Sequence, residues 1–322
     1  MVPQRAALGM GRGAYFPRAF SRPDVAMVPQ RAALGMGRGA LGGSVHSAAM
    51  YRPRRIVLIR HGQSAGNIDE EAYTTTPDWR IPLTAHGRAE AQGAGRKLRA
   101  LLEERSGARA YFYHSPYLRC QDTLDAIISQ LNPECIIGTR EEPRISEQQF
   151  GNLQSTAVTQ KSKAERNHFG RFYYRFPSGE SALDVYNRVS SFIATIYRDV
   201  EQMRGVGVLT PETHIVIVSH GLAARAFIMR WFQLTVGDFE LLSNQPNGSL
   251  LVMELHTDAM GNQWYELTHD SWKLLNADGC IDLKCIRVGG KPGEMRHLVR
   301  PQNVLPSVCG LAPPSPPTEL DG

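Results

Sequence analysis

The chain has 322 residues, of which 42% are hydrophobic and 21% charged, so it is long enough and apolar enough to bury a sizeable core. Its net charge of +5 comes entirely from residues 1–50, which contain six arginines and one aspartate, so residues 51–322 are balanced in charge. The charge balance of residues 51–322 argues against a nucleic-acid-binding face. No run approaches the roughly 18 apolar residues that a membrane span needs. We therefore expect neither a nucleic-acid nor a membrane partner.

The chain divides into three parts. Residues 1–50 carry a direct repeat, MVPQRAALGMGRGA, at 1–14 and again at 27–40, without an apolar period that could form a core. We expect a disordered or targeting extension there, or an inert one that precedes a true start at Met50. Residues 51–290 are the expected folded domain, and the proline-rich residues 291–322 the expected flexible tail.

Five scattered cysteines, none in a C-x-x-C pair, are typical of reduced thiols inside the cell. We expect a cytoplasmic protein. If residues 1–50 are a transit peptide, a chloroplast or mitochondrial location replaces the cytoplasmic one.

The folded domain begins with an apolar strand at 55–59. Thr84 can cap a helix that runs to about Glu103. A second strand at 110–113 is followed by Ser115-Pro116, a favoured start for a helix that runs to about residue 131.

Helix and strand continue to alternate after residue 180. The clearest helix, 180–203, repeats apolar residues at the 3–4 spacing of a core-facing stripe. A buried strand at 214–219 precedes a helix to about residue 232, and a further strand lies near 249–255. This alternation predicts a three-layer α/β/α sandwich around a largely parallel central sheet.

Two histidine–glycine pairs follow the carboxyl ends of predicted strands. His61 and Gly62 follow the first strand, and His220 and Gly221 follow the strand at 214–219. Ligands of open α/β sheets bind beyond the carboxyl ends of the strands. If these two strands are neighbours, both imidazoles lie at one edge, beside chain turns whose N–H groups favour an anion.

Four motifs in these segments resemble those of the histidine phosphatase (phosphoglycerate mutase-like) superfamily, in the same order. RHGQSAGN is similar to R-H-G-x-S-x-x-N, SPYLR to S-P-x-x-R, EQQFG to E-x-x-[FY]-G, and SHG to the second histidine; these stand at 60–67, 115–119, 147–151 and 219–221. The resemblance covers about residues 54–270. The runs TTTPDW and PLTAHGRAEAQG resemble plant phosphoglycerate mutase-like proteins in particular.

The resemblance implies a phosphoglycerate mutase-like fold for a catalytic domain at 51–290 and the hydrolysis of a phosphomonoester through a phosphohistidine. His61 would be the nucleophile, Glu147 the proton donor, and His220 a further catalytic group. The implied phosphate-binding residues are Arg60, Asn67, Arg119 and Gly221. Guanidinium forks suit phosphate oxygens, so no metal and no other cofactor is expected. The expected substrate is a phosphorylated small molecule or a phosphoprotein.

Two other functions stay open. The mutases of the family carry a tryptophan before the motif asparagine and a longer insert before the second histidine. Here Gly66 has the tryptophan's position, and His220 follows Glu147 by only 73 positions, which favours a phosphatase over a phosphoglycerate mutase. A non-catalytic phosphate-ester-binding protein is the third reading, although such a protein needs no proton donor.

The segment 155–177 mixes basic and aromatic residues. It either covers the substrate or forms a solvated helical surface. In the first case a second anionic group of the substrate would meet Lys161, Lys163, Arg166 or Arg171.

Overall fold

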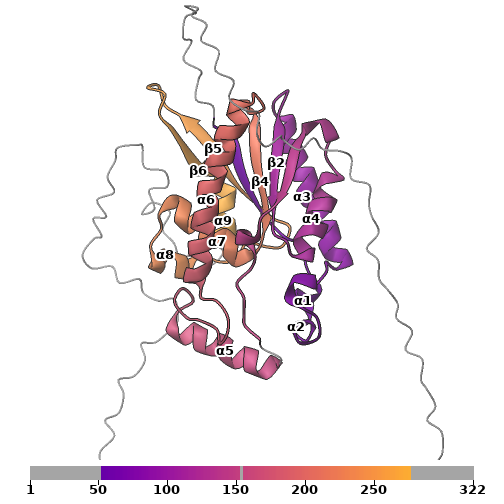
Figure 1. Cartoon of the computed structure of the whole chain (residues 1–322), viewed down its shortest axis with the longest axis vertical. Coiled ribbons are helices and arrows are strands. Elements are labelled where there is room, and N and C mark those ends of the chain that lie inside the picture. The colour runs from indigo at the N-terminus through magenta and orange to yellow at the C-terminus, as the bar shows by residue number, and fades with distance from the viewer. Residues whose placement is uncertain (1–51, 153–154, 277–322) are drawn as a thin grey trace, which may run out of the picture. The chain divides into compact units, whose positions relative to one another are not determined.

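The computed structural model describes residues 52–152 and 155–276, which include the whole predicted sheet (Figure 1). The extension at 1–50 and the tail at 291–322 lie outside these residues, so both remain predictions. Six strands form one sheet in the order β3-β2-β4-β1-β5-β6. The strands are β1 Arg55–Arg60, β2 Arg109–His114, β3 Ile136–Glu141, β4 Thr213–Ser219, β5 Leu250–Thr257 and β6 Gln263–Leu267.

Helices connect the strands and cover the sheet. The α-helices are α1 Ala65–Ile68, α2 Ala72–Thr75, α3 Ala85–Glu103, α4 Leu118–Ile128, α5 Thr156–Phe169, α6 Ala182–Gly205, α7 Gly221–Phe232, α8 Val236–Leu241 and α9 His269–Leu275. Three short 3-10 helices are η1 Asp78–Arg80, η2 Pro133–Cys135 and η3 Pro143–Ile145. No helix in the described part of the chain is both long and apolar enough to cross a membrane.

The sheet is largely parallel, as the sequence predicts. β3, β2, β4 and β1 run parallel to their neighbours, whereas β5 pairs antiparallel with β1 and β6 antiparallel with β5. The strands β3 and β6 were not predicted. Both lie at sheet edges and mix polar with apolar residues, so neither produces the continuous apolar run of a central strand.

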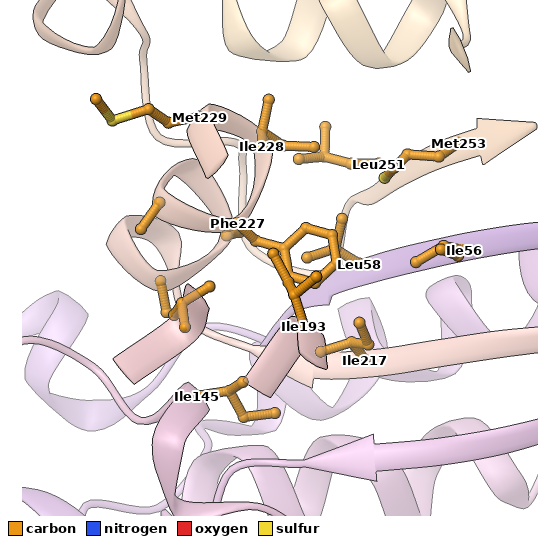
Figure 2. Packing of buried hydrophobic residues seen from close by; sticks show 14 of the residues in the cluster. Ile56, Leu58, Ile145, Ile193, Ile217, Phe227, Ile228, Met229, Leu251 and Met253 are labelled. Atoms are coloured by element: carbon orange, nitrogen blue, oxygen red, sulfur yellow. The ribbon is translucent and has the colours of Figure 1, made fainter. Parts of the chain in front are cut away.

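Successive residues of the central strands face opposite sides of the sheet and build two cores. Ile56 and Leu58 of β1 pack in the cluster that α6 and α7 cover, while Val57 and Ile59 pack in the cluster beneath α3 and α4. Figure 2 shows the first cluster, in which Leu58 lies beside Phe227 of α7. The three-layer arrangement is therefore confirmed (Figure 1).

One predicted helix start is wrong. Thr84 and Ser181 cap α3 and α6 as side-chain acceptors, but α4 begins at Leu118 with Tyr117 as its N-cap, and not at Pro116. The hydroxyl of Ser115 instead contacts His220 at 2.8 Å. A long-range contact has thus replaced the local capping role that the sequence favours.

A buried histidine lies in the middle layer away from the predicted site. His214 of β4 has no exposed surface, and neither ring nitrogen has a hydrogen-bond partner among the described residues. Burial, together with the charges of Arg55 and Arg54, lowers its pKa from 6.5 to about 3. Because the unfolded chain takes up this proton at a higher pH than the folded chain, the stability linked to His214 is lost as the pH falls below about 6.5.

We predict that His214→Val makes the protein less sensitive to acid. Between pH 7 and pH 5 the wild-type chain should lose about 2 kcal/mol of unfolding free energy through this one group, and the variant should lose correspondingly less. Urea unfolding at both pH values measures the difference. His86→Gln, at an exposed histidine, is the control. An equal loss in wild type and His214→Val would contradict the assignment.

Candidate active site

The pairing of β1 with β4 brings the two histidines together. The strands are adjacent and parallel, with Arg60 opposite Ser219, and the ladder continues one step further through the His61 N–H, which donates to the Ser219 carbonyl at 2.9 Å. His61 and His220 come directly after these paired residues. Their ring centroids lie 5.1 Å apart at an interplanar angle of 65°. The two strand-end motifs therefore form one site.

The hydrogen bond of His61 fixes which ring nitrogen can react. Nδ1 lies 2.7 Å from the carbonyl oxygen of Gly62, and a carbonyl can only accept, so Nδ1 carries the proton and Nε2 keeps its lone pair. The side chain is buried. Burial, and then the charges of Arg119 and Arg60, lower the pKa of His61 well below its usual value. The imidazole is thus neutral near pH 7.

His220 has the complementary arrangement. Its Nε2 lies 2.8 Å from the hydroxyl of Ser115, which itself accepts from the Tyr117 N–H at 3.4 Å. Cys120 Sγ also lies 3.4 Å from Nε2. If the Ser115 hydroxyl donates to Nε2, the ring proton is on Nδ1. That atom is buried and has no partner among the described residues. Burial, together with the charge of Arg119, lowers the pKa of His220 well below its usual value. His220 is thus neutral near pH 7, and with its proton on Nδ1 it can donate a hydrogen bond.

Arg119 is positioned by a carboxylate. It belongs to the first turn of α4, is 2% exposed, and its Nη1 donates to both the side-chain and the backbone oxygen of Asp78 at 2.8 Å. The guanidinium also lies 4.8 Å from the ring centroid of Tyr117. Burial lowers the pKa of Arg119, but Asp78, together with Cys120 and Tyr73, outweighs burial, so the pKa lies above its ordinary value. The charge is therefore fixed next to the histidines.

A loop rich in amides, here called the amide loop (residues 243–249), forms hydrogen bonds with the start of the RHGQSAGN motif. Arg60 donates through Nη1 to the carbonyl of Gln245 at 2.7 Å, and the Gly248 N–H donates to the Arg60 carbonyl at 3.1 Å. The side chain of Asn247 donates to the carbonyl of His61 at 2.9 Å. These bonds leave the Nε of Arg60 buried without a described partner.

The two remaining predicted phosphate ligands differ in their surroundings. Asn67 is exposed, and its side-chain oxygen accepts from the backbone and hydroxyl of Ser64, which caps α1. Gly221 is buried and begins α7, so its N–H is one of the first-turn donors that the helix itself cannot pair. Both residues can offer an N–H group to an anion, one from a side chain and one from the backbone.

Glu147 lies in the acid loop (residues 146–151). It is half-buried, and its Oε1 accepts from the N–H of Gln148 at 3.0 Å. Burial lowers the pKa of Arg60, and the Glu147 carboxylate opposes this shift more than any other charge, so the two side chains lie within electrostatic reach. The predicted proton donor therefore lies within electrostatic reach of Arg60.

Arg188 of α6 holds the acid loop in place. Its Nη1 donates to the carbonyls of Arg144 and Ser146 at 2.8 and 2.7 Å, and its Nη2 donates to that of Glu147 at 2.9 Å. The same guanidinium forms a bidentate pair with Glu180 at 3.1 and 3.0 Å. Two of the five hydrogen bonds go to backbone carbonyls of the acid loop itself, so Arg188 holds the loop that carries the predicted proton donor.

Gly62 is required for a reason that the sequence did not show. A Cβ atom at this position would lie 2.1 Å from the carbonyl oxygen of Gly87, in the first turn of α3. The glycine thus allows the chain after β1 to pass directly against the first turn of α3.

The structure brings together both histidines, both arginines, the acid loop and Gly221, with exposed Asn67 at the start of α1. Sequence reasoning missed Asp78, Arg188 and the amide loop as residues that position the site. Asp78 belongs to the TTTPDW run that carried a family resemblance, but Arg188 had no signal, because an arginine on a helix is usually solvated. No group of three or more His, Cys, Asp or Glu residues within the described ranges could hold a metal ion.

Comparisons with known proteins identify the family of the chain. The family model described as histidine phosphatase superfamily (branch 1) matches residues 56–267, more than half of the chain. The chain belongs to this superfamily.

The relatives of the chain include proteins that are named phosphoglycerate mutase-like and proteins that are named phosphatases. Phosphoglycerate mutase-like protein AT74H of Arabidopsis thaliana is 48% identical over 230 residues, which are 70% of this chain and 81% of that protein. Broad-range acid phosphatase DET1 of Saccharomyces cerevisiae is 31% identical, with 67% of this chain and 89% of that protein covered. A solved mycobacterial glucosyl-3-phosphoglycerate phosphatase has a TM-score of 0.51 at 22% identity, covering 70% of this chain and 99% of that one, and shares the fold.

We predict that Arg188→Lys lowers activity most for poor leaving groups. A lysine cannot reproduce the fork, so the acid loop should shift, and a shift of about 1 Å costs up to roughly a hundredfold in rate. The kcat values for an alkyl phosphate and for p-nitrophenyl phosphate measure the effect, because nitrophenolate hardly needs a proton.

The matched control is Arg198→Lys, at an exposed arginine of the same helix. Equal losses for both substrates in Arg188→Lys, or an equal pattern in Arg198→Lys, would rule out this positioning role.

Proposed function

We propose that the chain is a phosphatase that hydrolyses a phosphomonoester through a phosphohistidine on Nε2 of His61. The observation that carries the proposal is the hydrogen bond from Nδ1 of a buried, neutral His61 to the Gly62 carbonyl, which leaves Nε2 with an available lone pair. Arg60 and Arg119 lie close enough to affect that ring's pKa. A neutral nucleophile beside fixed positive charge suits attack on a phosphoryl dianion.

In the first half-reaction, Nε2 attacks phosphorus and the bond to the ester oxygen breaks. The phosphorylated ring becomes positively charged, and its Nδ1–H stays bonded to the Gly62 carbonyl, which stabilises that charge. Arg60, Arg119, the Nδ1–H of His220, the amide of Asn67 and the N–H of Gly221 would donate to the phosphoryl oxygens. Protonated Glu147 gives its proton to the leaving alkoxide.

In the second half-reaction, a water molecule attacks phosphorus and the N–P bond breaks. The Glu147 carboxylate takes a proton from this water, which restores the acid for the next cycle. Inorganic phosphate leaves, and His61 returns to its neutral form with the proton on Nδ1. The expected substrate is a phosphorylated small molecule, and a phosphoprotein is the broader alternative.

Phosphoryl transfer to a second substrate is the competing function. The mutase-like name of the plant relative favours it. The acid phosphatase name of the yeast relative, the glycine at position 66 and the short spacing between Glu147 and His220 favour hydrolysis. The same residues would serve both reactions, so the acceptor of the phosphoryl group is what must be measured.

We predict that His61→Ala abolishes the phosphoenzyme and lowers p-nitrophenyl phosphate turnover by roughly a thousandfold or more, because the nucleophile is lost. Glu147→Gln should slow an alkyl phosphate by about a hundredfold or more but p-nitrophenyl phosphate much less. Acid-labile phosphate labelling of the protein measures the phosphoenzyme, and steady-state rates measure the turnover of each ester. His86→Ala is the control. Phosphate-ester binding without turnover in wild type would instead identify a non-catalytic binding protein.

We predict that 3-phosphoglycerate with catalytic 2,3-bisphosphoglycerate releases phosphate faster than it exchanges isomers. Hydrolysis requires only water as the acceptor, whereas exchange requires a rotated second substrate in the same site. Isomer analysis and a phosphate assay on one reaction mixture give both rates. Rapid exchange with little free phosphate would replace the phosphatase by a mutase.

A further inference from the structure

A tyrosine that the proposed mechanism does not use lies against the RHGQSAGN motif. Tyr73 belongs to α2, which packs beside α1 (Figure 1). A Cβ atom at Gly66 would lie 2.5 Å from Cζ of Tyr73 and 2.7 Å from its hydroxyl oxygen. Both distances are too short for a real contact, so the phenol rests on the backbone of Gly66 itself. The glycine is what makes room for the ring.

Contacts of the next residue connect this phenol with the nucleophile. The side-chain oxygen of Asn67 lies 3.4 Å from Nδ2 of Asn247, and the same Nδ2 donates to the carbonyl of His61 at 2.9 Å. Tyr73 therefore packs on the segment that carries the predicted phosphate ligand Asn67, at the end of β1 where His61 lies.

The charged groups that affect Tyr73 are those of the candidate site. Burial raises the pKa of its hydroxyl, and the charge of Arg119 opposes this shift without cancelling it, while Asp78 and Glu147 raise the pKa as well. Tyr73 is in turn among the groups that oppose the lowered pKa of Arg60. The phenol is thus protonated near pH 7 and lies within electrostatic reach of both arginines and of the predicted proton donor.

The hydroxyl of Tyr73 is available as a donor. The phenols of Tyr113 and Tyr265 donate to Asp199 and to the carbonyl of Pro53. The half-buried phenol of Tyr73, by contrast, forms no hydrogen bond with any other residue in the ranges 52–152 and 155–276. A protonated phenol can donate to an anion without bringing negative charge toward it.

We propose that the hydroxyl of Tyr73 donates a hydrogen bond to an oxygen of the phosphoryl group that is transferred to His61. The inference rests on the proposed phosphatase function and adds a catalytic residue to it. Because this bond is made to the phosphoryl group, it forms whichever alcohol leaves. Its loss should therefore slow all esters alike, which distinguishes Tyr73 from a proton donor such as Glu147.

Tyr73→Phe tests the contact, because it removes the hydroxyl and keeps the ring. We expect kcat/KM to fall by about tenfold, the effect of one hydrogen bond to a charged group, and by the same factor for p-nitrophenyl phosphate and glycerol 3-phosphate. Titration calorimetry should show that inorganic phosphate binds about tenfold more weakly than to the wild-type chain. Tyr197→Phe, at an exposed tyrosine of α6, is the control and should change neither quantity.

Gly66→Ala tests the same contact from the other side. The added methyl group must displace the phenol, which is the flexible partner of this close approach. Phosphate binding should weaken about as much as in Tyr73→Phe, and the double variant should lose little more, because the hydroxyl has already moved away. Losses that add in full would overturn the proposal.

The outcomes separate this contact from the function on which it rests. Unchanged kcat/KM and unchanged phosphate binding in Tyr73→Phe would overturn the contact and leave the phosphatase function intact. A loss confined to glycerol 3-phosphate would also overturn it, since Tyr73 would then act on the leaving group. If the wild-type chain hydrolyses no ester while Tyr73→Phe still weakens phosphate binding, the proposed function fails and the contact stands.

Discussion

The parallel pairing of β1 with β4 is the constraint on which the site depends. Arg60 lies opposite Ser219, and the bond from the His61 N–H to the Ser219 carbonyl extends the ladder to the point where both chains turn away. A shift of one residue in this register would send one imidazole to the other face of the sheet. Because both strands are buried on both faces, alternating apolar residues in two cores fix the register. The packing of the sheet therefore sets the 5.1 Å separation of the two rings.

The charges and hydrogen bonds around His61 and His220 give the two imidazoles different roles. Both histidines are buried beside Arg119, which disfavours protonation of either ring. Their hydrogen bonds differ: Nδ1 of His61 donates to the Gly62 carbonyl, whereas Nε2 of His220 contacts the Ser115 hydroxyl and its Nδ1 has no partner among the described residues. One ring can thus offer a lone pair and the other a donor, although burial acts on both in the same way. The ion pair with Asp78 holds the guanidinium of Arg119 beside the two histidines, where its charge disfavours their protonation.

The sequence predicted those parts whose signals are local. Apolar runs identified β1 and β4, a 3–4 stripe identified α6, and the motifs named the residues at the ends of the strands. The start of α4 was predicted wrongly, because the Ser115 hydroxyl contacts a histidine 105 positions away in place of its own helix. Asp78, Arg188 and Gln245 were missed for the same reason, since each acts through a partner far along the chain. Local patterns cannot specify such contacts. The roles of the site residues themselves remain predictions that await the substitutions above.

Hydrolysis and phosphoryl transfer place opposite demands on the leaving group. An alcohol that stays bound after the first half-reaction can take the phosphoryl group back, so the proposed phosphatase must release it before water attacks. A mutase would instead have to hold the same group, so the balance between the two functions would depend on how strongly the site binds the departing alcohol.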